Sequence, residues 1–525
     1  MVSRRQTSSR TRRGGSSARR GAKSASAATA QAVRPGQVGG RYKPLSDADI
    51  ERIYQTALDV LENIGIGDPI SEILEYALPG GCTVDDDNRL RFPRSLVEDL
   101  IAKSPQQYPL YAPNPDRDLM VRGEEVLFCT SGEAVCILDY ESQRYRPTKL
   151  VDLYDAARLG DQLDHIHNFG QPFIAAEYSH DIFVHDMNIA YAELAGTDKS
   201  FALGISIAYH IDPLIELFDT YLGQEGGFAK RPFCTFGGCP IVSPLRFGQD
   251  GAEVMVKVAE LGMVADVAVA PQAGATAPAA LAGALVQCFA ETLACLCVVN
   301  LVRPGTPINF GMWPFISDLR TGSFSGGSGE EALVTAATAQ LCNHFGFTTS
   351  VGAGMTDAKT MDAQAGYEKA ITIATAALSG ANLVAAYPGI VGSLVAQSFE
   401  GMVIDNDLIG NVQRVLRGVE VTDATLSYDV IKETVYGQGH FLGSAQTLEL
   451  MNSEYLYPEL ADRRTPGEWG EMGRKTLYEQ AHERVGKMLA DHYPGYIDPD
   501  ADKRLRDRFP IRLEPEEMQP GNGRW

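Results

Sequence analysis

Short apolar runs alternate with longer helix-like segments between residues 161 and 420. Seven such runs are visible: NFGQPFIAA, FALGISIA, PFCTFGGCP, VADVAVAP, PINFGM, TTSVGAG and NLVAAYP. Strands that are buried on both faces and separated by helices pair in parallel. The segment EVLFCTS supplies an eighth candidate strand. The pattern therefore predicts a (β/α)8 TIM barrel. The chain has no G-x-G-x-x-G motif at a first strand-to-helix turn, so a dinucleotide-binding sheet is disfavoured.

The segments on either side of the predicted barrel follow different patterns. Residues 46–160 combine short strands with an amphipathic helix capped by Ser46, which predicts an α+β N-terminal region that packs on the barrel. Residues 421–525 are charged and helical, and we expect a C-terminal extension there. Residues 1–45 are rich in Ser, Gly, Ala and Arg without apolar periodicity, and they predict a disordered basic tail. A contact arm and a targeting segment are the alternatives for this tail.

The distribution of charge excludes one class of partner. The net charge is −21, yet residues 1–46 hold eleven basic residues and no acidic one. The remaining chain carries 35 basic against 67 acidic residues, a balance that disfavours binding to nucleic acid. The longest apolar run, residues 277–302, is interrupted by Gln287, Glu291 and Thr292, so we interpret it as a buried helix followed by a strand rather than a membrane span.

The cysteines and histidines do not form any known metal motif. Nine cysteines without framework spacing favour reduced thiols and a cytoplasmic location. The pair Cys295 and Cys297 lies in an apolar run and is expected to pack in the core. His165 and His167 have strand spacing, and no H-E-x-x-H or paired Cys/His set occurs. We therefore predict no metal site.

Polar residues gather after the strand TTSVGAG, where a barrel places its reactive groups. Asp357 and Lys359 fall in the loop that follows. Gln364, Tyr367 and Glu368 fall at positions i, i+3 and i+4 of the next helix and share one face. The apolar segment ITIATAALS that follows should draw the last two toward the core. A pocket is the preferred interpretation, and a solvated first turn of the helix is the alternative.

Three further residues are candidates for the site. Trp313 follows the strand PINFGM and either belongs to a cage for a cation or packs as a core residue. Arg320 lies beside Asp318 in a glycine-rich loop that lacks the Lys-Ser/Thr of a phosphate-binding loop. His440 lies between glycines, where a packed or hydrogen-bonded role is the alternative to a role in the site.

Several long blocks of the chain resemble the trimethylamine:corrinoid methyltransferase family. In chain order they include VLFCTSGEAVCILDYESQRYRPTKLVDLYDAARLGDQLDHI, VHDMNIAYAELAGTDKSF, APQAGATAPAALAGALVQCFAETLA, FGMWPFISDLRTGSFSGGSGEEAL, TTSVGAGMTDAKTMDAQAGYEKA and GHFLGSAQTLELMNSEYLYPELADRR. The resemblance covers residues 40 to 495 approximately. It is specific because long blocks agree in sequence and in spacing.

The resemblance implies a TIM-barrel enzyme that moves a methyl group from an amine to the Co(I) of a corrinoid. The corrinoid is carried by a separate small protein, so no cofactor is expected to be bound permanently. The archaeal trimethylamine enzymes of the family contain pyrrolysine, which this chain lacks. The chain therefore resembles the non-pyrrolysine branch, which includes enzymes for glycine betaine and similar quaternary amines.

The chemistry of a quaternary amine fits a site that positions its substrate. Loss of a methyl group leaves a neutral tertiary amine, so attack by Co(I) needs little acid or base catalysis and depends on orientation. We expect Asp357 or Glu368 to supply the charge opposite the cation, with Tyr367, Gln364 and Trp313 as further substrate contacts. A betaine also requires a partner for its carboxylate, for which the candidates are Lys359 and Arg320.

Two other functions stay open from the sequence. A Schiff-base aldolase or lyase would use Lys359 as its nucleophile, although the acids at 357 and 362 tend to raise the pKa of that amine. A non-catalytic barrel that binds amines is the second alternative. In either case the apolar exterior of the barrel suggests that the chain forms a homo-oligomer.

Overall fold

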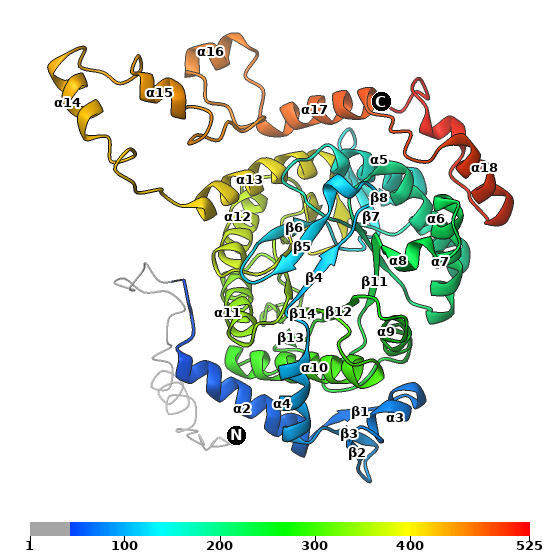
Figure 1. Cartoon of the computed structure of the whole chain (residues 1–525). Helices are drawn as coiled ribbons and strands as arrows, with labels where there is room; N and C mark the ends of the chain where they lie inside the picture. The colour runs from blue at the N-terminus through cyan, green and yellow to red at the C-terminus, as the bar shows by residue number, and fades with distance from the viewer. Residues whose placement is uncertain (1–41) are drawn as a thin grey trace, which may run out of the picture. The chain divides into compact units, whose positions relative to one another are not determined.

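Eight parallel strands form the central barrel (Figure 1). This computed structural model describes residues 42–525, so almost all of the predicted basic tail lies outside the described residues. Around the sheet the strands are β6 (Leu127–Cys129), β17 (Leu383–Ala385), β16 (Thr349–Gly352), β14 (Ile308–Met312), β12 (Ala265–Val269), β11 (Cys234–Gly238), β10 (Phe201–Gly204) and β9 (Phe169–Gly170). A parallel bridge between Cys129 and Asn168 joins the two end strands and closes the sheet. The predicted TIM barrel is confirmed, and each of the eight predicted runs contains one of its strands.

The two faces of these strands differ in the size of their side chains. Large apolar residues point outward to the helices: the ring of Phe201 lies 5.9 Å from that of Phe218, and the ring of Phe310 lies 6.0 Å from that of Phe289. Residues paired across neighbouring strands share a face. The register therefore gives the inward-facing set, in which every member except Leu127 and Leu383 is small or polar: Leu127, Cys129, Gly170, Ala202, Gly204, Thr235, Gly237, Asp266, Ala268, Asn309, Gly311, Ser350, Gly352, Leu383 and Ala385.

One helix follows each strand and covers the outside of the barrel. In chain order these helices are α5 (Leu150–Asp161), α6 (Ile182–Gly196), α7 (Ile211–Leu222), α9 (Gln249–Leu261), α10 (Leu281–Val302), α11 (Gly329–Phe345), α12 (Ala363–Leu378) and α13 (Phe399–Arg417), with the short α8 (Gly227–Lys230) after α7. This order places the loops that follow the strands at one end of the barrel, as in other barrels of this type.

Helix α10 occupies most of the longest apolar run. It has the length and hydropathy of a membrane span, but 83% of its most apolar window is buried. The expected strand at its end is wrong, because the helix continues to Val302 and β14 begins only at Ile308. Within the helix, Thr292 Oγ1 donates to the carbonyl of Cys288 at 2.8 Å, so this polar side chain is satisfied by the preceding turn.

The N-terminal region packs on the outer surface of the barrel. It contains α2 (Asp47–Asn63), α3 (Ser71–Ala77), α4 (Arg94–Lys103), a sheet of β1 (Ile66–Gly67), β3 (Arg89–Arg91) and β2 (Thr83–Val84), and a hairpin of β4 (Gln107–Leu110) and β5 (Leu119–Arg122). The predicted cap is present, since Ser46 and Asp49 form a capping box. The ring of Tyr54 in α2 lies 6.3 Å from that of Phe289 in α10. Strand β6 shows that the barrel begins before residue 161, inside the range 46–160.

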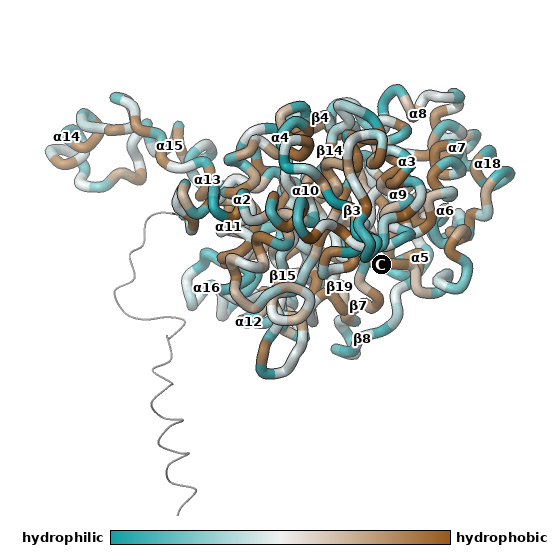
Figure 2. Tube along the Cα trace, turned by 90° about the horizontal axis from the view of Figure 1, so that it is seen from below, coloured by the Kyte–Doolittle hydropathy of each residue, from teal (hydrophilic) through white to brown (hydrophobic). Residues whose placement is uncertain are grey.

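The residues after α13 form two different parts. Helices α17 (Leu477–Asp491) and α18 (Pro499–Arg508) are docked: Arg158 of α5 is buried, and its guanidinium donates to the carbonyl of Leu489 at 3.0 Å. Helices α14 (Tyr428–Tyr436), α15 (Ala445–Leu450) and α16 (Pro466–Glu471) have almost no buried residues. Residues 415–477 carry 17 of the 35 exposed large apolar side chains in residues 42–525, and hydrophobic positions are visible along α14 in Figure 2. We refer to residues 415–477 as the arm.

Candidate active site

The interior of the barrel is a solvent-accessible lumen. Ala202, Thr235, Asp266 and Ala268 face inward from neighbouring strands, and all four are only half-buried although strands surround them. A typical barrel fills this space with bulky branched side chains. Here the inward-facing glycines and alanines leave it open, and the residues that follow the strands line its mouth.

Glu133 reaches into this lumen from the loop that follows β6. Its backbone has φ of +49°, a conformation that is uncommon and strained for a residue other than glycine. A Cβ atom built on Gly204 would lie 1.7 Å from Glu133 Oε1, so the glycine at the end of β10 creates the space that the carboxyl occupies. The side chain is exposed, but the surrounding protein desolvates it and raises its pKa, an effect that His185 opposes. Glu133 is thus an acid held across the mouth of the barrel.

Asp266 supplies a second carboxyl group at a deeper level. It accepts a hydrogen bond from Asn309 Nδ2 at 2.7 Å and one from Thr235 Oγ1 at 3.2 Å. Desolvation raises the pKa of Asp266, and the two hydrogen bonds oppose the shift. Both Glu133 and Asp266 add to the desolvation that raises the pKa of the Cys239 thiol to about 11. The two carboxyl groups therefore act on the same part of the lumen, beside the end of β11.

Aromatic rings form the opposite wall. The ring of Trp313, directly after β14, lies 6.2 Å from Phe315 and 6.2 Å from Tyr387, which it meets edge-on. Phe315 in β15 (Phe315–Ile316) continues the wall to Phe324 at 5.0 Å. A Cβ atom on Gly352 would lie 3.0 Å from the ring of Phe315 and 3.3 Å from the Tyr387 hydroxyl. The glycine at the end of β16 thus admits both rings. Aromatic faces arranged in this way attract cations.

A buried ion pair fixes the loop that carries Tyr387. Lys369 Nζ lies 3.0 Å from Asp405 Oδ2 and donates to the carbonyls of Gly354 at 2.7 Å and Tyr387 at 3.0 Å. Asp405 in turn accepts from the backbone N–H of Gly389 at 2.7 Å. Tyr387 has φ of +43° and is 1% exposed. The ion pair of Lys369 and Asp405 therefore fixes Tyr387 in this strained conformation, and both charges of the pair are already compensated.

Behind Tyr387 lies a buried acid without a full set of partners. Glu331, in the first turn of α11, is 1% exposed, and its Oε2 has no hydrogen-bond partner. Burial raises the pKa of Glu331 well above its usual range. Its charge, when present, would act on Tyr387.

The polar cluster that the sequence singled out forms a network of its own. Asp357 accepts hydrogen bonds from Ser325 Oγ at 2.8 Å and Ser393 Oγ at 2.6 Å, which joins the loop after β16 to two neighbouring loops. Glu368 is buried and accepts from the Asp357 N–H at 2.8 Å and from Gln364 Nε2 at 2.9 Å. These contacts give Asp357, Gln364 and Glu368 a role in fixing the loops. Their catalytic or binding role stays a prediction.

Other predicted site residues lie on the surface. Tyr367 is 63% exposed, so its expected position near the core is wrong; the face of α12 that carries Glu368 turns inward and Tyr367 lies beside it. Lys359 is exposed, and its amine bonds the carbonyl of Asp357 two residues earlier. The side chain of Arg320 is 89% exposed and paired with Asp318 at 2.6 Å.

His440 and Trp313 have different outcomes. His440 is exposed and lies in the arm, where the expectation of a packed residue is wrong. Trp313 is half-buried and lies beside the rings of Phe315 and Tyr387, and its role in a cage for a cation stays a prediction. The sequence analysis missed Glu133, Asp266 and Tyr387. The available signal was position, because Glu133 comes shortly after the predicted run EVLFCTS and Tyr387 lies near the end of the predicted run NLVAAYP.

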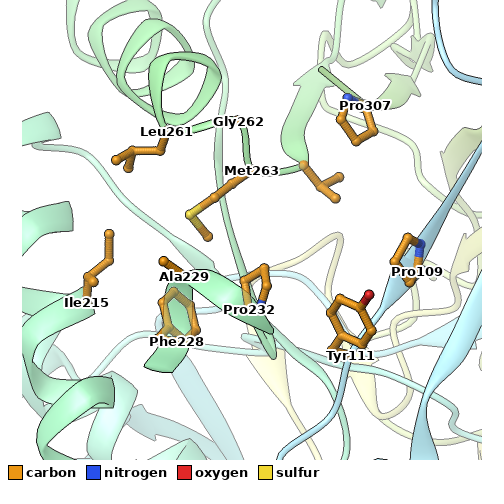
Figure 3. A pocket seen from close by; sticks show the side chains of 11 residues that line it. Pro109, Tyr111, Ile215, Phe228, Ala229, Pro232, Leu261, Gly262, Met263 and Pro307 are labelled. Atoms are coloured by element: carbon orange, nitrogen blue, oxygen red, sulfur yellow. The ribbon is translucent and has the colours of Figure 1, made fainter. Parts of the chain in front are cut away.

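No candidate metal centre occurs in the described part of the chain, since residues 42–525 contain no group of three His, Cys, Asp or Glu side chains able to hold an ion. An apolar pocket of about 270 Å³ lies between Tyr111, Phe228, Met263 and Pro307 (Figure 3). Met263 and Pro307 precede β12 and β14, so the pocket lies at the amino ends of the strands, opposite the mouth. It contains none of the groups described above.

Several known proteins are similar to this chain. The glycine betaine methyltransferase of Desulfitobacterium hafniense is 29% identical over 471 residues, covering 90% of this chain and 97% of that protein. The trimethylamine methyltransferase MttB1 of Methanosarcina acetivorans is 30% identical, with 87% and 92% covered. Among solved structures, the monomethylamine methyltransferase MtmB of Methanosarcina barkeri is 14% identical with a TM-score of 0.43, covering 85% of this chain and 94% of that one.

A model of the trimethylamine methyltransferase (MTTB) family matches residues 12–514, which is nearly the whole sequence. The match includes the barrel, the aromatic wall, both lumen carboxyl groups and the docked C-terminal helices. The chain therefore belongs to the trimethylamine methyltransferase family.

Proposed function

We propose that this methyltransferase takes a methyl group from a methylated ammonium compound and transfers it to the Co(I) of a corrinoid carried by a separate protein. Family membership supports the reaction class. The relatives act on glycine betaine and on trimethylamine, as their names state. The corrinoid is a substrate delivered by its carrier and not a resident group of this chain.

One observation carries the substrate class: the lumen combines carboxyl groups with aromatic faces. Glu133 and Asp266 are accessible from the lumen, and Trp313 and Phe315 are half-buried in its wall. Desolvation raises the pKa of both acids, and a cation beside them favours their ionised forms. Cation–π attraction of about 0.5–2 kcal/mol adds to this electrostatic attraction. A methylated ammonium matches both features.

In this reaction the barrel has to orient its substrate, and proton transfer plays little part. The bond between nitrogen and the methyl carbon breaks, nitrogen keeps the electron pair, and the Co(I) nucleophile forms the new bond to carbon. A quaternary nitrogen leaves as a neutral amine, so no proton has to be supplied. Trp313 and Phe315 would hold the cation while its methyl group points out of the mouth, which is catalysis by orientation.

This mechanism limits how strongly the carboxylates can attract the substrate cation. Positive charge leaves the amine in the transition state, so a carboxylate that binds the ground-state cation too strongly slows transfer. The hydrogen bonds from Asn309 and Thr235 to Asp266 share its charge and moderate this attraction. The small residues around the lumen leave the end of the barrel open for the corrinoid carrier.

The geometry does not favour a Schiff-base aldolase. Lys359 is exposed, and its amine already bonds a backbone carbonyl of its own loop. The buried Lys369 is paired with Asp405 and bonds two carbonyls, so its amine is not free to attack a substrate. Neither lysine has the accessible position that an amine nucleophile needs.

Methyl transfer tests the proposal. The purified chain is mixed with a Co(I)-corrinoid carrier protein that is active with a known methyltransferase, and methylated amines are added one at a time. We expect at least one of them to convert the Co(I) spectrum to that of methyl-Co(III), because the lumen orients the cation for attack. A non-catalytic amine-binding barrel would bind the amine without any spectral change.

We also propose that the chain self-associates through the arm. The arm exposes many apolar side chains, including Tyr436 at 87% and Leu442 at 83%. A transient carrier protein would leave these side chains in water between turnovers, whereas permanent homo-oligomer interfaces are apolar. Light scattering should show a dimer or larger species for the wild type and a monomer for a Tyr436→Asp, Leu442→Asp double variant. A monomeric wild type would refute the proposal.

A further inference from the structure

We infer that the floor of the lumen binds a hydroxyl group of the substrate, so the preferred class is a quaternary ammonium compound with a short hydroxyalkyl tail, such as choline. This inference rests on the proposed function and adds a second point of contact for its substrate. The floor is formed by Tyr108, Asn309 and Asp266. Tyr108 is 2% exposed and Asn309 is 6% exposed, and each has a polar side-chain atom without a hydrogen-bond partner among the described residues.

Tyr108 enters the barrel from the end opposite the mouth. Its hairpin, β4 and β5, is drawn across the middle of the ring of strands in Figure 1. The side chain of Tyr108 packs in one cluster with those of Leu127 and Leu383. These two leucines are the first residues of β6 and β17, and they face inward. The ring of Tyr108 therefore stands inside the lower end of the barrel.

The hydroxyl group of Tyr108 points up into the lumen. Its oxygen is buried and has no partner in the described part of the chain. Burial raises the pKa of Tyr108, and the charges of Asp266 and Cys129 add to this shift. Both of these residues face inward from their strands, above the leucines that hold the ring. The phenol is neutral and has a proton to donate.

Asn309 presents the complementary atom. Its Nδ2 donates to Asp266 Oδ1 at 2.7 Å, and a carboxylate can only accept, so the amide nitrogen is the atom that faces Asp266. Asn309 Oδ1 is then left as a buried acceptor without a donor among residues 42–525. Unpaired buried polar atoms cost stability, so two of them beside one carboxyl group indicate a place for a ligand.

A hydroxyl group satisfies both atoms at once. Its oxygen accepts the proton of Tyr108 Oη, and its own proton is donated to Asn309 Oδ1. An ether oxygen can only accept, and a methyl group can do neither. The floor therefore distinguishes a hydroxyalkyl tail from an alkyl tail of the same size.

The floor lies within reach of a cation held at the aromatic wall. Trp313 Nε1 donates to Ser350 Oγ at 3.2 Å, and Ser350 pairs with Gly311 of β14. Asn309 lies two residues before Gly311 on the same face of the strand, a separation of about 7 Å. A short hydroxyalkyl chain and its hydrogen bond cover this separation. The methyl groups on nitrogen then face the mouth, where the proposed reaction requires them.

Calorimetry of the intact chain at pH 7.5 tests this inference with a matched pair of ligands. Propyltrimethylammonium has a methyl group in the place of the choline hydroxyl group, and we expect the wild type to bind choline about 10-fold more tightly. Tyr108→Phe keeps the ring and removes one hydrogen bond. Its affinity for choline should fall by about 3- to 10-fold, whereas its affinities for propyltrimethylammonium and tetramethylammonium should not fall.

Tyr111→Phe is the matched control variant. Tyr111 directly follows β4, is half-buried, and lines the apolar pocket at the amino ends of the strands instead of the lumen. Losing its hydroxyl group should leave all three affinities unchanged. A thermal melt of each variant shows that the chain is folded.

The outcomes separate this inference from the function on which it rests. If the wild type binds tetramethylammonium but does not prefer choline to propyltrimethylammonium, the inference is overturned and the proposed function stays intact. A preference for choline that Tyr108→Phe leaves unchanged also overturns it, because the floor would then not be the cause. If folded wild-type protein binds none of the three compounds, the cation site itself is wrong, and the inference is wrong with it.

Discussion

Replacing Gly204 with valine is expected to lower methyl transfer by about 100-fold or more while the barrel still folds, an effect of the size seen when a preorganised charge is displaced. A Cβ atom at this position would lie 1.7 Å from Glu133 Oε1 and 2.9 Å from its Cδ, and no backbone atom is among its close contacts. The flexible end of Glu133 must therefore leave the lumen. The substitution therefore moves the Glu133 carboxyl group out of the site, while the carboxyl group itself is chemically unchanged.

The assay for this variant compares the rate of methyl transfer with the thermal melting curve. Gly366→Val is the matched control, because Gly366 also lies in the barrel domain and a Cβ atom there meets nothing within 4 Å. We expect the control to retain the wild-type rate. A Gly204→Val protein with full activity would show that the position of Glu133 is irrelevant.

Replacing Trp313 with alanine is expected to weaken cation binding by about 10- to 30-fold, which corresponds to the loss of about 1.4–2 kcal/mol from one desolvated cation–π contact. Trp313 contacts both Phe315 and Tyr387, and its Nε1 donates to Ser350 Oγ at 3.2 Å. Removing the indole opens the wall at the point where these rings meet. Trp313→Phe keeps an aromatic face and should lose less affinity.

Calorimetric titration with tetramethylammonium measures this effect independently of the corrinoid carrier. Trp469→Ala provides a control of the same chemical type, since Trp469 lies in α16 of the arm and is 36% exposed. Equal affinities of Trp313→Ala and the wild type for tetramethylammonium would show that the aromatic wall does not bind the cation.

The barrel itself could be predicted from the sequence because its signal is local. Each strand is a short apolar run, and each run is followed by a helix, so the topology follows from the pattern. The boundary at residue 161 was less well defined, because the hairpin of β7 (Cys136–Asp139) and β8 (Arg144–Pro147) separates β6 from α5 and hides the first strand-helix unit.

The site could be predicted only as a location. Asp357 and Glu368 do follow a barrel strand, but Asp357 accepts hydrogen bonds from two neighbouring loops, and Glu368 accepts one from the N–H of Asp357. Glu133 enters the lumen because Gly204 lacks a side chain, and these two residues are distant in the sequence. Whether Glu133 meets Gly204 depends on how three strands of the barrel are aligned with one another. No local pattern in the chain describes it.

The most direct test of the account compares two single variants in the methyl-transfer assay. Glu133→Gln changes the lumen, and Lys359→Met changes the exposed loop that the sequence favoured. We predict that Glu133→Gln loses most of the rate with the best quaternary substrate, by about 10-fold or more, because the cation loses its counter-charge. Lys359→Met should keep the wild-type rate. Full activity in Glu133→Gln together with loss in Lys359→Met would contradict the account and move the site to the loop.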